Sequence, residues 1–219
     1  MKRLIIICEG QTEQEFCGKV LFPHLYKYDI NIQTPLIKRS MGGIVKWSIL
    51  KKEIENYLLE KDAIVTTLID YYGLYQKYNF PKWEEGEKIV DKIKRIGFLE
   101  DAMKEDISDN LRYRFIPYLQ LHEFEGLLFN DIQIFYDQVP KSNLVGIEEL
   151  EKTFENYSNP EMINNSRETS PSHRLERIIK GYNKPLYGHY FAEAIGIERI
   201  REKSPRFDQW IKNIIDFEI

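Results

Sequence analysis

The sequence predicts an α/β fold in which a mainly parallel sheet is flanked by helices. Residues 3–8 and 63–70 form largely apolar runs, which is the pattern of strands buried on both faces. Stretches with helical spacing lie between the extended ones, so strands and helices alternate in the first part of the chain. This alternation favours a parallel sheet with crossover helices.

The elements of the first 70 residues can be assigned in order. The strand at residues 3–8 is followed by a helix, with Thr12 available as its N-cap and Phe16 and Val20 on one side. An extended stretch, an amphipathic helix and a buried strand then fit residues 30–38, 46–61 and 63–70. The last of these strands ends in Asp70.

The chain after Asp70 is less regular. A tyrosine-rich loop at residues 71–81 precedes a long charged helical stretch at 84–106, and residues 112–129 read as a strand that runs into a helix near His122. Beyond residue 130 the chain is polar and is interrupted by proline and glycine residues, which are typical of turns and loops. We therefore expect an α/β core at residues 1–130 and a mainly helical C-terminal extension, residues 131–219, packed on that core.

Composition limits the class of protein. With 219 residues, 13% aromatic residues and a net charge of −4, the chain is long enough for a core and is not expected to be disordered or generally basic. The positive charge is local, because residues 167–206 contain nine Lys or Arg against five Asp or Glu. A basic face for an anionic ligand is therefore still expected there.

Cysteine usage and hydropathy bear on the compartment. Cys8 and Cys17 form no CxxC pair and no zinc-type cluster, so buried, reduced thiols are expected. The apolar run near the N-terminus stops at Cys8 and Glu9, too early for a signal peptide. With no stretch of membrane-spanning length in the sequence, we expect a cytoplasmic protein without a membrane partner.

Acidic residues follow three predicted strands. Glu9, Asp70 and Glu123 stand at the strand ends, with Glu125 close behind the last. The carboxyl ends of parallel strands share one edge of a sheet, where ligands gather. Carboxylates brought together repel one another unless a cation binds them, and hard oxygen ligands suit Mg²⁺ or Mn²⁺. Taken alone, Glu13 can equally be a solvated or helix-dipole residue.

A family resemblance begins with these residues. The segment "EGQTE" resembles the signature of the Toprim fold in nucleases of overcoming-lysogenization-defect type. A wider pattern resembles the bacterial, Toprim-related family called domain of unknown function 4276 over nearly the whole chain, through "CEGQTEQEF", "LIDYYG", "LHEFEGLLF", "SPSHRL" and "YNKPLYGHYFAEAIGIERIREKSPRFDQWI". The resemblance implies a Toprim-like, Rossmann-like core and a partner ATPase encoded nearby in a phage-defence system.

The resemblance also implies roles for the acids. Glu9 and Glu13 would be metal ligands or the general base, Asp70 a ligand, and Glu123 or Glu125 a further acid. Toprim enzymes usually carry Asp-x-Asp after the third strand, whereas this chain has Asp70, Tyr71 and Tyr72. Because a phenol does not replace a carboxylate on Mg²⁺ at neutral pH, Glu123 or Glu125 supplies the missing charge, one ion binds, or catalysis is lost.

The basic segment offers candidate phosphate ligands. Ser170 or Ser172 can cap a helix that starts at Pro171, and Arg174 and Lys184 can clamp a phosphate. His173 is a weaker, pH-dependent cation beside them. The alternative is a solvated amphipathic helix whose cations face water.

Two further features keep two interpretations each. His122 stands beside Glu123 and is either a metal or acid/base group or a structural histidine. The aromatic residues after Asp70 either stack on unpaired bases or pack in the core and against partners; they are Tyr71, Tyr72, Tyr75, Tyr78 and Phe80.

The sequence favours an enzyme, a metal-dependent phosphodiesterase of Toprim type that acts on DNA or RNA. Mg²⁺ or Mn²⁺ would be held by Glu9, Asp70 and an acid of the Glu123/Glu125 pair, with Arg174 and Lys184 on the phosphate. The alternative is a non-catalytic, Toprim-like docking or sensing subunit of an ATPase complex.

Overall fold

The computed structural model describes residues 1–38, 43–164 and 166–218. Within these residues it contains a five-stranded parallel sheet with the order β2-β1-β3-β4, and β5 also pairs with β3. The strands are β1 Lys2–Cys8, β2 Ile30–Gln33, β3 Ala63–Asp70, β4 Phe115–Ile116 and β5 Leu119–Gln120. The predicted α/β class with a mainly parallel sheet is confirmed, and its topology is Rossmann-like.

The centre of the sheet is the pair β1 and β3, which run in register from Arg3 opposite Ala63 to Cys8 opposite Leu68. Every residue of β1 from Leu4 to Cys8 is fully buried, because both faces of the strand are covered. Alternate side chains enter different apolar clusters, one on each face of the sheet. This explains why the strand is a continuous apolar run.

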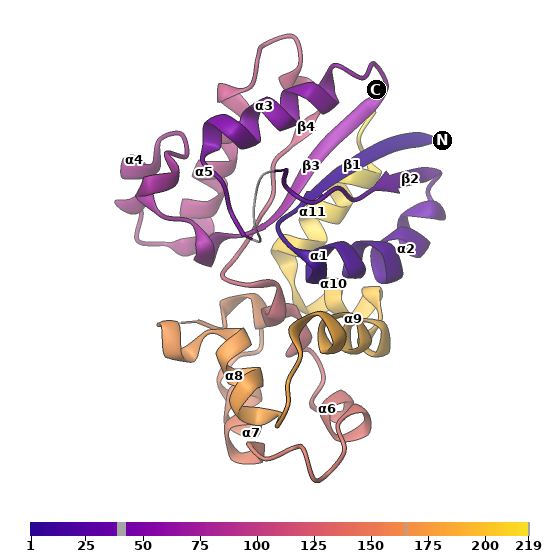
Figure 1. Cartoon of the computed structure of the whole chain (residues 1–219), viewed down its shortest axis with the longest axis vertical. Helices are drawn as coiled ribbons and strands as arrows, with labels where there is room; N and C mark the ends of the chain where they lie inside the picture. Colours follow the sequence, from indigo (N-terminus) through magenta and orange to yellow (C-terminus); the bar gives the residue numbers. More distant parts are fainter. Residues whose placement is uncertain (39–42, 165, 219) are drawn as a thin grey trace.

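Helices cover both faces of the sheet, as Figure 1 shows. The face with Leu4 and Ile6 packs on α1 (Gln11–Phe16), α2 (Phe22–Tyr26) and α11 (Pro205–Ile215). The face with Ile5 and Ile7 packs on α3 (Trp47–Leu58) and α5 (Lys92–Asp106). A π-helical turn at Cys17–Leu21 joins α1 to α2.

The chain after residue 130 is helical in its described part. It forms α6 (Ile132–Gln138), α7 (Ile147–Asn156), α8 (Pro171–Ile178), α9 (Lys184–Ile195) and α10 (Ile197–Lys203) before α11. In Figure 1, α6 to α9 lie beyond the edge of the sheet at which β1 and β3 end. One apolar cluster contains Leu4 and Phe124 together with Phe191 and Phe207, so the boundary after residue 130 stays a prediction.

Several predicted elements differ from the structure. Gly10, not Thr12, is the N-cap of α1, and Thr12 is buried. The expected helix at 84–106 is two helices, α4 (Trp83–Glu87) and α5, because Asp91 caps α5 by accepting from the Lys94 N–H. The second strand stops at Gln33, before Pro35.

The region expected as a strand and helix at 112–129 is also shorter in its regular parts. Pro117 separates β4 from β5, since proline has no N–H for the ladder. The expected helix near His122 is a 3₁₀ helix. The 3₁₀ segments are Tyr71–Gly73, Gln76–Tyr78, Arg112–Arg114, Phe124–Leu128, Pro160–Met162 and Arg167–Thr169.

Two other expectations concern the thiols and the membrane. Cys8 and Cys17 are buried and unpaired, as predicted, with their sulfur atoms 4.0 Å apart. Among the described residues, no helix combines the length and the apolar character needed to cross a bilayer.

The close approach of α9 to α1 gives a first testable prediction. A Cβ added at Gly188 would lie 2.6 Å from Thr12 Cγ2, and Thr12 is buried. We expect Gly188→Ala to lower the free energy of unfolding by about 1 to 2 kcal/mol through overpacking. Gly97→Ala in α5, where no heavy atom lies within 4 Å of the new Cβ, is expected to be neutral or stabilising. Urea unfolding measures the free energy of unfolding of both variants and of the wild type. Equal values for the two variants would contradict the prediction.

Candidate functional site

The acids that follow the strands come together at one edge of the sheet. Glu9 directly follows β1, and Asp70 is the last residue of β3, the neighbouring strand. Glu9 Oε2 accepts a hydrogen bond from the Asp70 N–H at 3.0 Å, and Asp70 Oδ1 accepts from the Phe124 N–H at 2.9 Å. These bonds connect the ends of β1 and β3 to the loop that carries Glu123 and Glu125.

Glu13, in the first turn of α1, belongs to the same group. Its Oε2 accepts from the Gly10 N–H at 2.9 Å, and its side chain is buried. A Cβ at position 10 would lie 3.1 Å from Glu13 Oε2, so the glycine leaves room for this carboxylate. The buried, bonded position replaces the solvated alternative that the sequence left open for Glu13.

The carboxylates share one electrostatic environment. Burial raises the pKa of Glu9 and of Glu125 to about 7 and raises that of Asp70 well above its usual value. The charge of Glu13 contributes to the increase in all three groups. Glu13 is therefore their common neighbour.

Glu125 is the least satisfied of these acids. It is fully buried, and among the described residues neither of its oxygens accepts a well-oriented hydrogen bond. Lys184 Nζ lies 2.9 Å from Glu125 Oε1 as an ion pair. Burial lowers the pKa of Lys184, but Glu125, Asp70 and Glu13 outweigh this and raise the pKa above its usual value. Lys184 is thus a charged counter-ion of the acidic group.

Glu123 connects the site to α8. Its Oε2 accepts from the Ser172 N–H at 2.9 Å, and the residue is buried. A carboxylate at the first turn of a helix is favoured by the helix dipole. The predicted helix start is also confirmed, with Ser170 at the N-cap position and Pro171 in the first turn. The Ser170 hydroxyl pairs with His173 Nδ1 at 2.8 Å instead of capping.

The predicted phosphate ligands lie in different places. Lys184 contacts the acidic group, whereas the Arg174 guanidinium binds the Thr169 carbonyl at 2.8 Å and Thr153 Oγ1 at 3.0 Å. Glu149 lies 3.7 Å from the same guanidinium. Arg174 is therefore held against α7, and His173 is held by its own helix.

The donor atoms fit a hard divalent cation. As the side chains stand, no three His, Cys, Asp or Glu residues within the described ranges are arranged to ligate one metal ion. The carboxylates of Glu9, Glu13, Asp70 and Glu125 nevertheless supply hard oxygens. Apart from the ion pair with Lys184, neither Glu125 oxygen has a hydrogen-bond partner among the described residues. Burial and, after it, mutual repulsion raise the pKa values there, and a bound cation relieves the repulsion.

His122 directly precedes Glu123 and contacts Lys92 of α5. It is buried, with a positive φ of 66°, and its Nε2 is 3.4 Å from Lys92 Nζ. Burial and the charge of Lys92 lower the pKa of His122 to about 4. It is therefore a neutral histidine at neutral pH. The sequence did not single out Lys92, since it stands among several lysines of a charged stretch.

Comparison with known proteins gives one family. The chain has no significant match among curated proteins or among solved structures. The model of the family described as "Domain of unknown function (DUF4276)" matches residues 8–215. This match includes the acids from Glu9 to Glu125 and Lys184. The chain therefore belongs to the DUF4276 family.

Proposed function

We propose that this protein is a divalent-metal-dependent phosphodiesterase of Toprim type that cleaves DNA or RNA. One observation carries the proposal: Glu9, Glu13, Asp70 and Glu125 share a site at the carboxyl edge of a parallel sheet, where burial and repulsion raise the pKa values of three of them. Such clusters of shifted groups are typical of functional sites.

The carboxylates have distinct proposed roles. Glu9, Asp70, Glu123 and Glu125 would hold Mg²⁺ or Mn²⁺, which supplies an activated water and neutralises charge on the phosphate. Glu125 provides the acid that the Toprim pattern places two residues after Asp70, where this chain has Tyr72. If Glu9 is a metal ligand, Glu13 accepts the proton of the water; if Glu9 does not bind the metal, its pKa of about 7 suits it for the role of general base.

Lys184 is the cation that we assign to the phosphate. Its ammonium group lies at the acidic site, where positive charge stabilises the charge that develops on phosphate oxygens. Arg174 and His173 have neighbours of their own, so we propose for them only a supporting role in placing α8. A partner ATPase and a place in phage defence belong to the proposal through the family resemblance alone.

A cleavage assay tests this function. The purified protein, alone and with an ATPase encoded nearby, is incubated with plasmid, single-stranded DNA and tRNA in Mn²⁺ and in EDTA. We expect cleavage in Mn²⁺ and none in EDTA. Intact substrates in every combination, together with an unchanged melting temperature in Mn²⁺, would overturn the proposal.

A second candidate is a non-catalytic, Toprim-like subunit of an ATPase complex. It is favoured by the Lys184 to Glu125 ion pair, in which an internal cation already occupies the acidic site. In that case the fold needs no metal, and its acids serve only the protein's own structure.

Lys184→Met separates the two candidates. The Glu125 side chain is fully buried but that of Lys184 is 42% exposed, so removing the ammonium group is expected to cost about 2 kcal/mol of unfolding free energy at neutral pH, between the values for exposed and buried ion pairs. If the site binds metal, Mg²⁺ restores most of this loss, because the ion replaces the missing charge. Thermal unfolding with Mg²⁺ and with EDTA measures it. A loss that Mg²⁺ leaves unchanged would favour the non-catalytic subunit.

A further inference from the structure

A cavity of about 700 Å³ is lined in part by Tyr71 and His122, which are next to Asp70 and Glu123 in the chain. Its walls come from the loop after β3, from α4 and α5, and from His122. Aromatic and cationic side chains dominate this lining, among them Tyr71, Tyr72, Tyr75, Trp83, Lys92 and Arg95. A cavity of this size holds a small organic ligand.

The cavity and the acidic site share two loops. Tyr71 and Tyr72 directly follow Asp70, and His122 directly precedes Glu123. The Tyr72 N–H donates to the His122 carbonyl at 2.9 Å, which ties the two loops together. A Cβ at Gly73 would lie 3.6 Å from Glu9 Oε1. The carboxylates of Glu9, Asp70 and Glu123 do not themselves line the cavity, so the two sites are neighbours through the loops that they share.

Lys92 supplies the charge of the cavity. Its side chain is half-buried, and its Nζ lies 3.0 Å from the Asn164 carbonyl and 3.4 Å from His122 Nε2. Over the described part of the chain, no carboxylate forms an ion pair with it. Its positive charge is therefore available to an anion.

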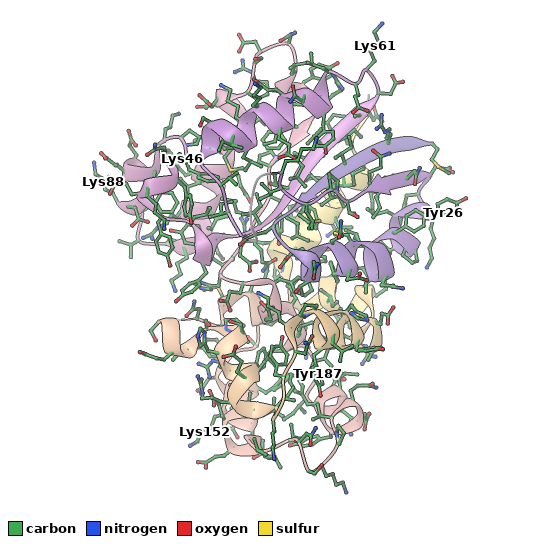
Figure 2. All side chains as sticks on the ribbon, viewed as in Figure 1. Tyr26, Lys46, Lys61, Lys88, Lys152 and Tyr187 are labelled. Carbon is green, nitrogen blue, oxygen red and sulfur yellow. The ribbon has the colours of Figure 1, made fainter. Side chains whose placement is uncertain are left out.

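The other charged lining groups are partly compensated. Arg95 pairs with Glu87 at 3.3 Å and with the Tyr71 hydroxyl at 3.2 Å. Glu84 accepts from Gln76 at 3.1 Å. Lys88 also lines the cavity and is exposed on the outer left of the molecule in Figure 2. The cations exceed the acids in this lining, which favours an anionic ligand.

The aromatic side chains of the lining are the second feature that bears on the ligand. Tyr75 is 53% exposed, whereas Tyr71 packs on the buried Trp83, with ring centroids 5.9 Å apart. Exposed aromatic faces stack on unpaired bases, and such stacking is tolerant of sequence. A base inside a duplex is already stacked and cannot use them. An excess of cations beside an exposed aromatic ring therefore matches a nucleotide outside a duplex.

We propose that this cavity binds an unpaired nucleotide of single-stranded nucleic acid, with a phosphate at Lys92 and a base against Tyr75. The adjoining phosphodiester then faces the carboxylates, a step that rests on the proposed function. The basic segment at residues 167–206 is not needed for this contact. Lys92 is a binding residue of the substrate strand.

Binding in EDTA tests the inference without cleavage. Fluorescence anisotropy follows labelled oligothymidylate and oligouridylate of roughly ten nucleotides and a blunt hairpin duplex of DNA. We expect at least one single strand to bind about 10-fold more tightly than the duplex. The two single-stranded arms separate DNA from RNA.

Matched variants locate the binding. Lys92→Ala is expected to weaken single-strand binding about 10-fold, and Tyr75→Ala about 5-fold. Lys94→Ala, exposed on the same helix, and Tyr26→Ala, whose side chain is 54% exposed on α2, are the controls and should bind like the wild type. Circular dichroism checks that Lys92→Ala is folded, and Lys92→Gln replaces it if it is not.

The outcomes separate this inference from the proposed function. Wild-type affinity in the folded Lys92 variant, equal loss in Lys94→Ala, or equal binding of duplex and single strands would overturn the inference, and Glu9-dependent cleavage would still stand. Binding that depends on Lys92 in a protein that never cleaves would support the inference and count against the phosphodiesterase.

Discussion

Glu9→Gln is expected to lower Mn²⁺-dependent cleavage by at least ~100-fold, the usual loss when a catalytic acid–base group is removed. Glutamine keeps an oxygen that can accept from the Asp70 N–H, so the loop after β3 keeps its position. The variant removes the negative charge and the basic oxygen. Initial rates on the preferred substrate, at saturating Mn²⁺, measure the effect.

Glu15→Gln is the matched control, because Glu15 lies on the same helix as Glu13 but is exposed to solvent. It should retain wild-type rates. Full activity in Glu9→Gln would place the chemistry elsewhere, and an equal loss in both variants would indicate a general effect of negative charge in the segment from Glu9 to Glu15.

The second large effect concerns pH. Burial and neighbouring acids raise the pKa of Glu125 from 4.5 to about 7, so the folded state holds a proton that the unfolded state releases. Stability is therefore greatest below the unfolded pKa and falls as pH rises from about 4.5 to about 7. Glu9 shifts in the same direction. Because these groups belong to one cluster, we expect them together to lower the unfolding free energy by on the order of 2 kcal/mol between about pH 5.5 and 8, or by several degrees in Tm.

Mg²⁺ is expected to recover this loss at about pH 8 and to have little effect at about pH 5.5, because protonated carboxyls bind it poorly. Differential scanning fluorimetry from about pH 5.5 to about pH 8, with and without Mg²⁺, measures the pH dependence of Tm and the effect of the metal on it. Burial also raises the pKa of Glu100 to about 7, although the pair with Arg206 opposes the shift, and Mg²⁺ should not change its contribution. Glu125→Gln therefore separates the contribution of the acidic site to the pH dependence from that of Glu100. A Tm that is independent of pH, or that rises toward pH 8 without metal, would contradict the account.

The core of the fold follows from the sequence because local pattern and burial agree there. β1 and β3 are apolar on both faces, and the structure covers both faces. Their neighbouring positions explain why Glu9 and Asp70 meet, since acids after adjacent parallel strands share one edge. Element boundaries that are set by one residue are harder to predict. An example is Pro117, which divides the expected strand into β4 and β5.

The cations of the site could not be assigned from sequence. Arg174 and Lys184 look alike in a basic segment, but the packing of α7 against α8 directs Arg174 to Thr153 and Glu149, while α9 carries Lys184 to Glu125. Lys92 is even harder to identify, because its role depends on the distant His122 and Asn164. Long-range contacts of this kind leave no periodic signal in the chain.

Calorimetric titration of Mn²⁺ at about pH 8, into the wild type and into Glu125→Gln, tests most directly whether the convergent carboxylates are a cation site. We expect saturable binding of Mn²⁺ to the wild type and binding at least ~10-fold weaker in the variant, which keeps the size of the side chain but loses its charge. No binding to the wild type, or equal affinity in both proteins, would contradict the account.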